Sequence, residues 1–166
     1  MKASHFSKDI QEFIELLTKH SVKYVIVGGE AVIYYGYARL TGDVDFLYEP
    51  SRENVSYLCR ALDEFWGGNI PGIDTFDDLM ETGTILQFGV PPNRLDLVNK
   101  IDGVTFGEVW KGKTIECIEI QGQKIQVNFI GLEQLIKNKE KVRRPKDVED
   151  LKYLKKAKSK QNNAVS

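Results

Sequence analysis

Three aspartates have the spacing of a metal site that acts on phosphate. Asp43 and Asp45 open the segment 43–48 (DVDFLY), which alternates polar and apolar residues at its start, as a half-buried strand does. Residues two apart in a strand share a face, and two ionised carboxylates side by side repel each other unless a cation lies between them. Oxygen-only ligands favour a hard cation such as Mg²⁺. The motif alone leaves open a pair of solvent-facing aspartates on an edge strand.

The third acid is Asp96, flanked by leucines in the segment 94–98 (RLDLV). If this strand lies beside the segment 43–48, three carboxylates converge. Such a set can hold two metal ions about 3.5–4 Å apart, the arrangement that stabilises the attacking and leaving oxygens in phosphoryl transfer. A surface aspartate beside Arg94 is the alternative, and spacing does not decide between them.

A glycine pair could bring backbone close to a ligand. Gly28-Gly29 follows the apolar run 24–27 (YVIV) and precedes helix-like material at 30–37. Glycine permits close backbone approach, and the N-terminus of a following helix offers free N–H groups to phosphate. Most such pairs are merely tight turns, and this one is neither a Walker loop nor a GxGxxG motif.

The elements that must position these residues alternate along the chain. The segment 67–83 reads as a loop with one helical turn at most, and Ser51 is a plausible N-cap. We therefore predict one α+β domain over residues 1–158, with a mixed central sheet flanked by helices and a disordered polar tail at 159–166. The expected strands are 24–27, 43–48, 84–88, 94–98, 114–120 and 124–129, and the expected helices are 4–20, 30–37, one from 51 to about 65, 132–142 and 145–158.

Composition and charge limit the classes of function. The 166 residues are 42% hydrophobic and 28% charged, which excludes collagen, coiled coil and wholesale disorder. The formal net charge is −1, but residues 131–166 carry 11 basic and 5 acidic side chains. This basic helical C-terminal part indicates either a charged ligand or a solvated lysine-rich helix.

Cysteine use and hydropathy bear on the compartment. Cys59 and Cys117 form no CxxC pattern, so neither a disulfide framework nor a zinc site is expected. There is no apolar run long enough to span a membrane, and the N-terminus lacks the apolar stretch of a signal peptide. These features favour a cytoplasmic protein without membrane contact.

The ordered combination of motifs resembles the DNA polymerase beta-like nucleotidyltransferase superfamily. The residues that carry the likeness are Val27-Gly28-Gly29, the segment 39–45 (RLTGDVD) and Leu95-Asp96-Leu97. The segments 134–137 (QLIK) and 144–151 (RPKDVEDL) also resemble the end of small bacterial members. The resemblance implies the polymerase beta-like fold with a C-terminal helical segment.

The resemblance also implies roles for single residues. Gly28 and Gly29 would hold the nucleotide triphosphate, and Asp43 and Asp45 would ligate two Mg²⁺ ions, with Mn²⁺ as a substitute. Asp96 would complete one metal site and help to deprotonate the acceptor hydroxyl.

Basic side chains near these motifs are candidates for binding phosphate. Arg39 and Thr41 directly precede the paired aspartates, and Arg39 either reaches phosphate or pairs with an acid. Among the later basic residues, Lys137 is the first candidate for the triphosphate; the others are Lys141, Arg143, Arg144 and Lys146. Glu30 would oppose a triphosphate if it faced one, or else it points away and favours the helix N-terminus.

The resemblance implies ATP or another NTP as substrate and transfer of a nucleoside monophosphate to a hydroxyl, with release of pyrophosphate. The acceptor would be a small molecule, a tRNA or a protein, and small bacterial or archaeal members include antibiotic-modifying enzymes and components of toxin–antitoxin systems. A homodimer could add acceptor-binding surface. The alternative is a non-catalytic nucleotide-binding or antitoxin-like partner protein that keeps the fold.

Overall fold

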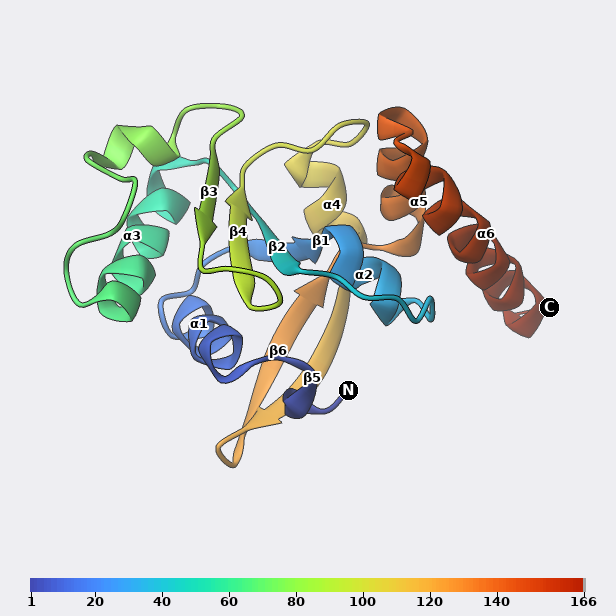
Figure 1. Cartoon of the computed structure of the whole chain (residues 1–166), viewed down its shortest axis with the longest axis horizontal. Helices are drawn as coiled ribbons and strands as arrows, with labels where there is room; N and C mark the ends of the chain where they lie inside the picture. The colour runs from blue at the N-terminus through green and yellow to red at the C-terminus, as the bar shows by residue number, and fades with distance from the viewer. Residues whose placement is uncertain (166) are drawn as a thin grey trace.

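The computed structural model describes residues 1–165 as a mixed sheet with helices around it (Figure 1). Strands and helices alternate, which confirms the predicted α+β class. The strands are β1 (Tyr24–Val27), β2 (Asp43–Tyr48), β3 (Ile85–Phe88), β4 (Arg94–Val98), β5 (Thr114–Ile120) and β6 (Gln123–Phe129). The helices are η1 (Ala3–His5), α1 (Lys8–Lys19), α2 (Gly28–Tyr34), α3 (Arg52–Trp66), η2 (Phe76–Leu79), α4 (Phe106–Gly112), α5 (Leu132–Val142) and α6 (Pro145–Val165).

The sheet has six strands in the order β3-β4-β2-β1-β6-β5. Two neighbouring pairs are parallel, β2 with β4 and β1 with β6, and the other pairs are antiparallel. The predicted mixed sheet is thus confirmed. In this order β2 lies inside the sheet, between β1, to which it is antiparallel, and β4, to which it is parallel.

The core explains why β1 has no polar residue. All four of its residues are buried, as expected for a central strand covered on both faces. Helix α1 packs an apolar stripe onto the sheet, where the ring of Phe13 lies 5.2 Å from that of Phe46 on β2. Hydrophobic packing of α1 against one face of the sheet therefore fixes the position of β2.

Helix caps follow the sequence closely. The Ser51 hydroxyl accepts a hydrogen bond from the Asn54 amide, so the predicted N-cap of α3 is confirmed. Ser7 caps α1 in the same way, so that helix begins at Lys8 and not at Ser4.

Other helices also differ from the prediction, and α2 spans Gly28–Tyr34 where 30–37 was expected, because the helix already begins at the glycine pair. The sequence reading missed α4, although Thr105 and Glu108 form a capping box at its start. Helix α6 continues to Val165, so the prediction of a disordered tail from residue 159 was wrong for 159–165, and Ser166 lies outside the described residues. No glycine or proline interrupts this lysine-rich and alanine-containing stretch, and such residues favour helix. Between Met1 and Val165, the structure contains no helix with the length and apolar character needed to cross a membrane.

Candidate active site

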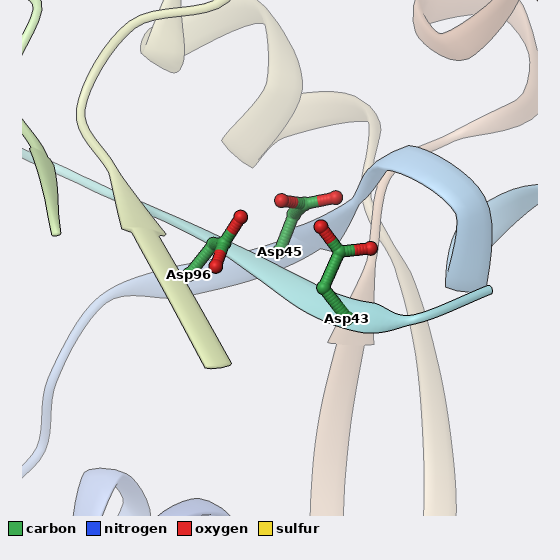
Figure 2. Close-up of side chains that lie close together, drawn as sticks. All are labelled: Asp43, Asp45 and Asp96. Atoms are coloured by element: carbon green, nitrogen blue, oxygen red, sulfur yellow. The ribbon is translucent and has the colours of Figure 1, made fainter. Parts of the chain in front are cut away.

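The parallel pairing of β2 and β4 brings the three aspartates together. Asp45 lies directly opposite Asp96 in the register, and Asp43 lies opposite Arg94. The carboxylates point toward one another from the two strands (Figure 2), and each offers an oxygen within 4.8 Å of the others. The predicted convergence of Asp43, Asp45 and Asp96 is therefore present in the fold. We call this set the acid face.

The acid face is short of positive charge. Burial, together with the neighbouring carboxylates of Asp43 and Asp96, raises the pKa of Asp45 to about 7. Burial also raises the pKa of Asp96, although hydrogen bonds from Arg94 oppose this shift. A cation bound between these carboxylates would offset their mutual repulsion. The donor set, made of three carboxylates, fits Mg²⁺ or Mn²⁺.

Arg94 is the nearest cation to the acid face. Its Nη2 donates to Asp43 Oδ2 at 2.7 Å, and its Nε donates to Asp96 Oδ1 at 3.0 Å. The two strands align Arg94 with these acids because residues 94 and 96 share a face of β4. One guanidinium thus orients two carboxylates, and Asp45 receives no hydrogen bond from it among the described contacts.

The glycine turn lies against Asp45. Because β1 and β2 are antiparallel, Val27 pairs with Asp45 and the chain enters Gly28-Gly29 beside that carboxylate. Gly28 has φ +67°, and a Cβ there would overlap Asp45 Oδ2. A Cβ on Gly29 would lie 2.7 Å from Thr41 Oγ1. Only glycine therefore fits this turn, which explains the pair seen in the sequence.

A cleft of about 590 Å³ opens over the acid face. One wall holds the glycine turn with Arg39 and Thr41, and the Thr41 hydroxyl donates to Asp43 Oδ1 at 3.1 Å. The opposite wall comes from the end of α5 and the start of α6. Its cationic residues are Lys139, Arg144 and Lys146.

Comparison with known proteins agrees with this geometry. A family model described as "Nucleotidyltransferase of unknown function (DUF6036)" matches residues 6–159. The chain belongs to this family. The match confirms the predicted nucleotidyltransferase superfamily and covers both walls of the cleft.

Other comparisons add little to the family assignment. Among solved structures, the fold is similar to a crystal structure of an antigenic nucleotidyltransferase-like protein from Paracoccidioides brasiliensis, with 17% identity and a TM-score of 0.49. The match covers 90% of this chain and 77% of that chain. No curated protein matches the sequence.

A buried ion network supports the wall of the cleft that carries Lys139, Arg144 and Lys146. Lys139 is 3% exposed, and its Nζ lies 2.8 Å from Asp147 Oδ1 and 3.0 Å from Asp150 Oδ2. Arg39 donates to both oxygens of Asp150, at 2.9 and 3.1 Å, and Arg144 donates to Asp147. Burial alone would raise the pKa of Asp147, but hydrogen bonds from Arg144 and Lys139 outweigh it and hold that pKa at about 2.

The structure places Lys137 away from the cleft. Its side chain is 55% exposed, lies 3.9 Å from Glu133 and does not line the cavity. On a helix the neighbouring apolar stripe turns Lys139, and not Lys137, toward the core. Our expectation that Lys137 binds the triphosphate is therefore not supported by its position.

Two further expectations are settled by contacts. Arg39 pairs with the acid Asp150 and also lines the cleft, so the pairing is present and contact with phosphate stays a prediction. Glu30 is buried and lies 2.6 Å from His5 Nε2, outside the residues that line the cleft. The glycine turn thus faces the cleft without the opposing charge of Glu30.

Sequence reasoning missed Arg94 as an organiser of the acid face and Lys139 as the centre of the network. Both left a signal. Arg94 is two residues from Asp96 in a strand, so the two side chains must share a face. Lys139 falls at seven residues from Leu132 on the apolar stripe of α5, where a lysine is buried only if it is paired.

Proposed function

We propose that this protein is a metal-dependent nucleotidyltransferase that moves a nucleoside monophosphate from an NTP to a hydroxyl acceptor and releases pyrophosphate. One observation carries the proposal: three carboxylates lie within 4.8 Å of one another on a strand pair that faces a cleft. Membership of a nucleotidyltransferase family supports the same reaction class.

The acid face supplies the ligands for the metal. Asp43, Asp45 and Asp96 would hold Mg²⁺ or Mn²⁺, and a bound cation would offset the burial and the carboxylate repulsion that raise the pKa of Asp45. When bound, the ions would offset phosphate charge and ease ionisation of the acceptor hydroxyl. Arg94 and Thr41 hold the carboxylates in place from either side.

The glycine turn and the basic wall would position the triphosphate. Gly28 and Gly29 let backbone approach it closely, because no side chain fills that space. Lys146 is exposed, lines the cleft and lowers the pKa of Asp45 through its charge, so we assign it the triphosphate in place of Lys137. Arg39 is paired with Asp150 and Arg144 with Asp147, and both guanidinium groups also line the cleft, where they could contact the triphosphate.

In the transfer step, the acceptor oxygen forms a bond to the α-phosphorus and the bond from that phosphorus to the bridging oxygen breaks. Asp96 takes the hydroxyl proton, and pyrophosphate leaves with the electron pair of the broken bond. Burial raises the pKa of Asp96, which favours a carboxylate that accepts a proton. Positioning and charge compensation, and not a covalent enzyme intermediate, supply most of the rate in such a reaction.

Transfer of labelled nucleotide tests the proposal. The protein is incubated with Mg²⁺ and each of four NTPs labelled at the α-phosphate, together with fractionated cell extract as the source of acceptor. We expect the α-label, and not a γ-label, to enter one acceptor class with one preferred NTP. The variant Asp43→Asn/Asp45→Asn should lose this transfer.

A matched variant controls for the loss of two negative charges. Asp74→Asn/Asp77→Asn makes the same change on an exposed loop and should label the acceptor as the wild type does. Equal transfer by the acid-face variant would refute the proposal. Absence of transfer with retained thermal stabilisation by NTP would favour the non-catalytic nucleotide-binding alternative, and absence of both would favour the antitoxin-like one.

A further inference from the structure

Helix α6 carries a row of cationic and aromatic side chains that begins at the cleft. Lys146, Tyr153, Lys156 and Lys160 follow one another at intervals of seven, three and four residues, so they lie on one face of the helix. Lys146 lines the cleft over the acid face. With a rise of 1.5 Å per residue, the row extends roughly 21 Å from that point. We call these four residues the α6 row.

The outer half of α6 extends past α5 (Figure 1), and Gln161 in this half lines an open pocket with Tyr35 and Gly131. After Leu154, residues 155–165 are exposed except for Ala157, which is partly buried. This part of the helix has no apolar stripe that could pack against a core, so most of its surface is open to a binding partner.

The accessible charge of α6 is positive. Of its three acids, Asp147 and Asp150 are buried in the ion network, and Glu149 is paired with Lys152 at 3.1 Å. Lys160 has no ion-pair partner among residues 1–165, and Lys156 lies over the ring of Tyr153 at 5.7 Å. The α6 row is therefore cationic and uncompensated.

An aromatic pair interrupts this charge near the cleft. The Tyr153 ring stacks on Tyr37 with centroids 3.7 Å apart and planes 4° apart, and Tyr153 remains 39% exposed. Tyr37 lies two residues before Arg39 of the cleft wall. Lysines along a track with an exposed ring are the features by which proteins hold single-stranded nucleic acid.

We propose that the α6 row is a docking surface for single-stranded RNA, and that this RNA is the acceptor of the transferred nucleotide. This inference rests on the proposed function. Phosphates would lie along Lys156 and Lys160, a base would stack on the tyrosine pair, and a ribose hydroxyl would reach the acid face past Lys146. That oxygen would attack the α-phosphorus of the NTP, its proton would pass to Asp96, and pyrophosphate would leave. RNA is favoured over an acidic protein because it combines regular negative charge with bases that stack.

Binding is measured without NTP or metal, by fluorescence anisotropy of a 5′-fluorescein-labelled RNA 20-mer of mixed sequence. The variant Lys156→Gln/Lys160→Gln removes two positive charges while it keeps a polar side chain and a similar helix propensity, and we expect its affinity to fall about tenfold. Its slope of log affinity against log salt should be smaller by about 1.4, since two phosphate contacts are lost.

The control variant is Lys8→Gln/Lys124→Gln, which removes the same charge from exposed sites on α1 and β6. These elements lie away from α6 (Figure 1). The control should bind RNA as the wild type does. An equal loss of affinity in both variants would reduce the effect to net charge and overturn the docking surface.

Other probes separate the competing partners. Equal binding of a poly-glutamate peptide would assign the surface to an acidic protein, and equal labelling of a DNA 20-mer would overturn the assignment of RNA as acceptor. Asp43→Asn/Asp45→Asn should bind RNA normally.

The two proposals can fail separately. If the wild-type protein binds RNA but transfers no nucleotide, only the proposed function is contradicted. If the wild-type protein labels extract normally but does not bind RNA, only the docking surface is contradicted.

Discussion

Two carboxylate clusters about the same cleft differ in how their charge is balanced. The acid face sets Asp43, Asp45 and Asp96 against the single guanidinium of Arg94. The buried ion network sets Asp147 and Asp150 against three cations, which are Lys139, Arg39 and Arg144. The pKa of Asp45 is raised to about 7, whereas that of Asp147 is lowered to about 2.

The difference separates a structural use of aspartate from a ligand-binding use. Ion pairs with Lys139 and Arg144 hold the pKa of Asp147 at about 2, and the pairs of Asp147 and Asp150 fix α5 to α6 and to Arg39. Incomplete pairing leaves the three carboxylates of the acid face close together with Arg94 as their ion-pair partner, a charge imbalance that a bound metal ion would offset. The buried ion network stabilises the fold, whereas the acid face has the arrangement expected of a metal-binding site.

The largest expected effect comes from the acid face. Asp45→Asn should lower nucleotidyl transfer on the order of 10⁴-fold, equivalent to about 5 kcal/mol, because it removes a metal ligand. Transfer is measured with α-labelled NTP under saturating Mg²⁺. The metal-free variant should remain folded, so a loss of transfer that accompanies unfolding in circular dichroism would not fit a ligand role.

Substitutions in the buried ion network should lower the stability of the fold, whereas substitutions in the acid face should lower transfer and leave the protein folded. Lys139→Met leaves Asp147 and Asp150 without their buried partner, and we expect it to lower the free energy of unfolding by about 3–5 kcal/mol. Urea denaturation measures this loss. Lys137→Met lies on the same helix with an exposed side chain and should change stability by less than about 0.5 kcal/mol. Equal effects of the two variants would contradict the buried network.

Much of this contrast was accessible from the sequence, and part of it was not. The alternation around Asp43 and the lone acid at Asp96 indicated strands whose pairing would gather carboxylates, and the register bears this out. Lys137 was the first candidate for the triphosphate because charge was read without helical phase, and its exposed side chain does not line the cleft. Only the phase of the apolar stripe in α5 distinguishes an exposed lysine from a buried one.

Long-range partners were the other limit. Nothing local in the sequence pairs Arg39 with Asp150, 111 positions later, because that contact depends on how α6 returns to the loop before β2. The end of α6 was misjudged for a similar reason, since polar composition alone does not separate a helical arm from a disordered tail.

The glycine turn links both regions and should tolerate little change. Gly28→Ala adds a Cβ at φ +67° that overlaps Asp45, so we expect about 1–2 kcal/mol of destabilisation from backbone strain alone. Affinity for NTP should also fall, because the carboxylate must move. Gly107 lies in helix α4, and a Cβ added there would lie 3.9 Å from Thr105 Oγ1. Gly107→Ala should therefore leave stability unchanged or slightly raised.

The smallest effects concern pH and have opposite signs in the two clusters. The folded state holds a proton on Asp45 up to a pKa of about 7, whereas the unfolded chain releases it near 3.8, so Asp45 costs stability increasingly as pH rises through that window. Asp147 has a pKa of about 2 when folded and 3.8 when unfolded, so it contributes stability above about pH 4 that is lost toward pH 2.

Thermal denaturation without metal from pH 5 to pH 8 checks both signs. Relative to the wild type, Asp45→Asn should gain roughly 1–2 kcal/mol over this range, since each pKa unit is worth about 1.4 kcal/mol and partial exposure reduces it. Asp147→Asn should be destabilised throughout the range by a nearly constant amount. The comparison would fail if both variants shifted stability in the same direction.

Counting bound metal tests the central claim most directly. Isothermal titration of Mn²⁺ into the protein, in the presence of a triphosphate that cannot be hydrolysed between its α- and β-phosphates, gives the number of ions and their affinity. Two ions per chain are expected for the wild type and for Asp74→Asn/Asp77→Asn, with none at the same concentrations for Asp43→Asn/Asp45→Asn. Equal binding by the acid-face variant, or no metal binding by the wild type, would contradict the assignment of Asp43, Asp45 and Asp96 as a metal centre.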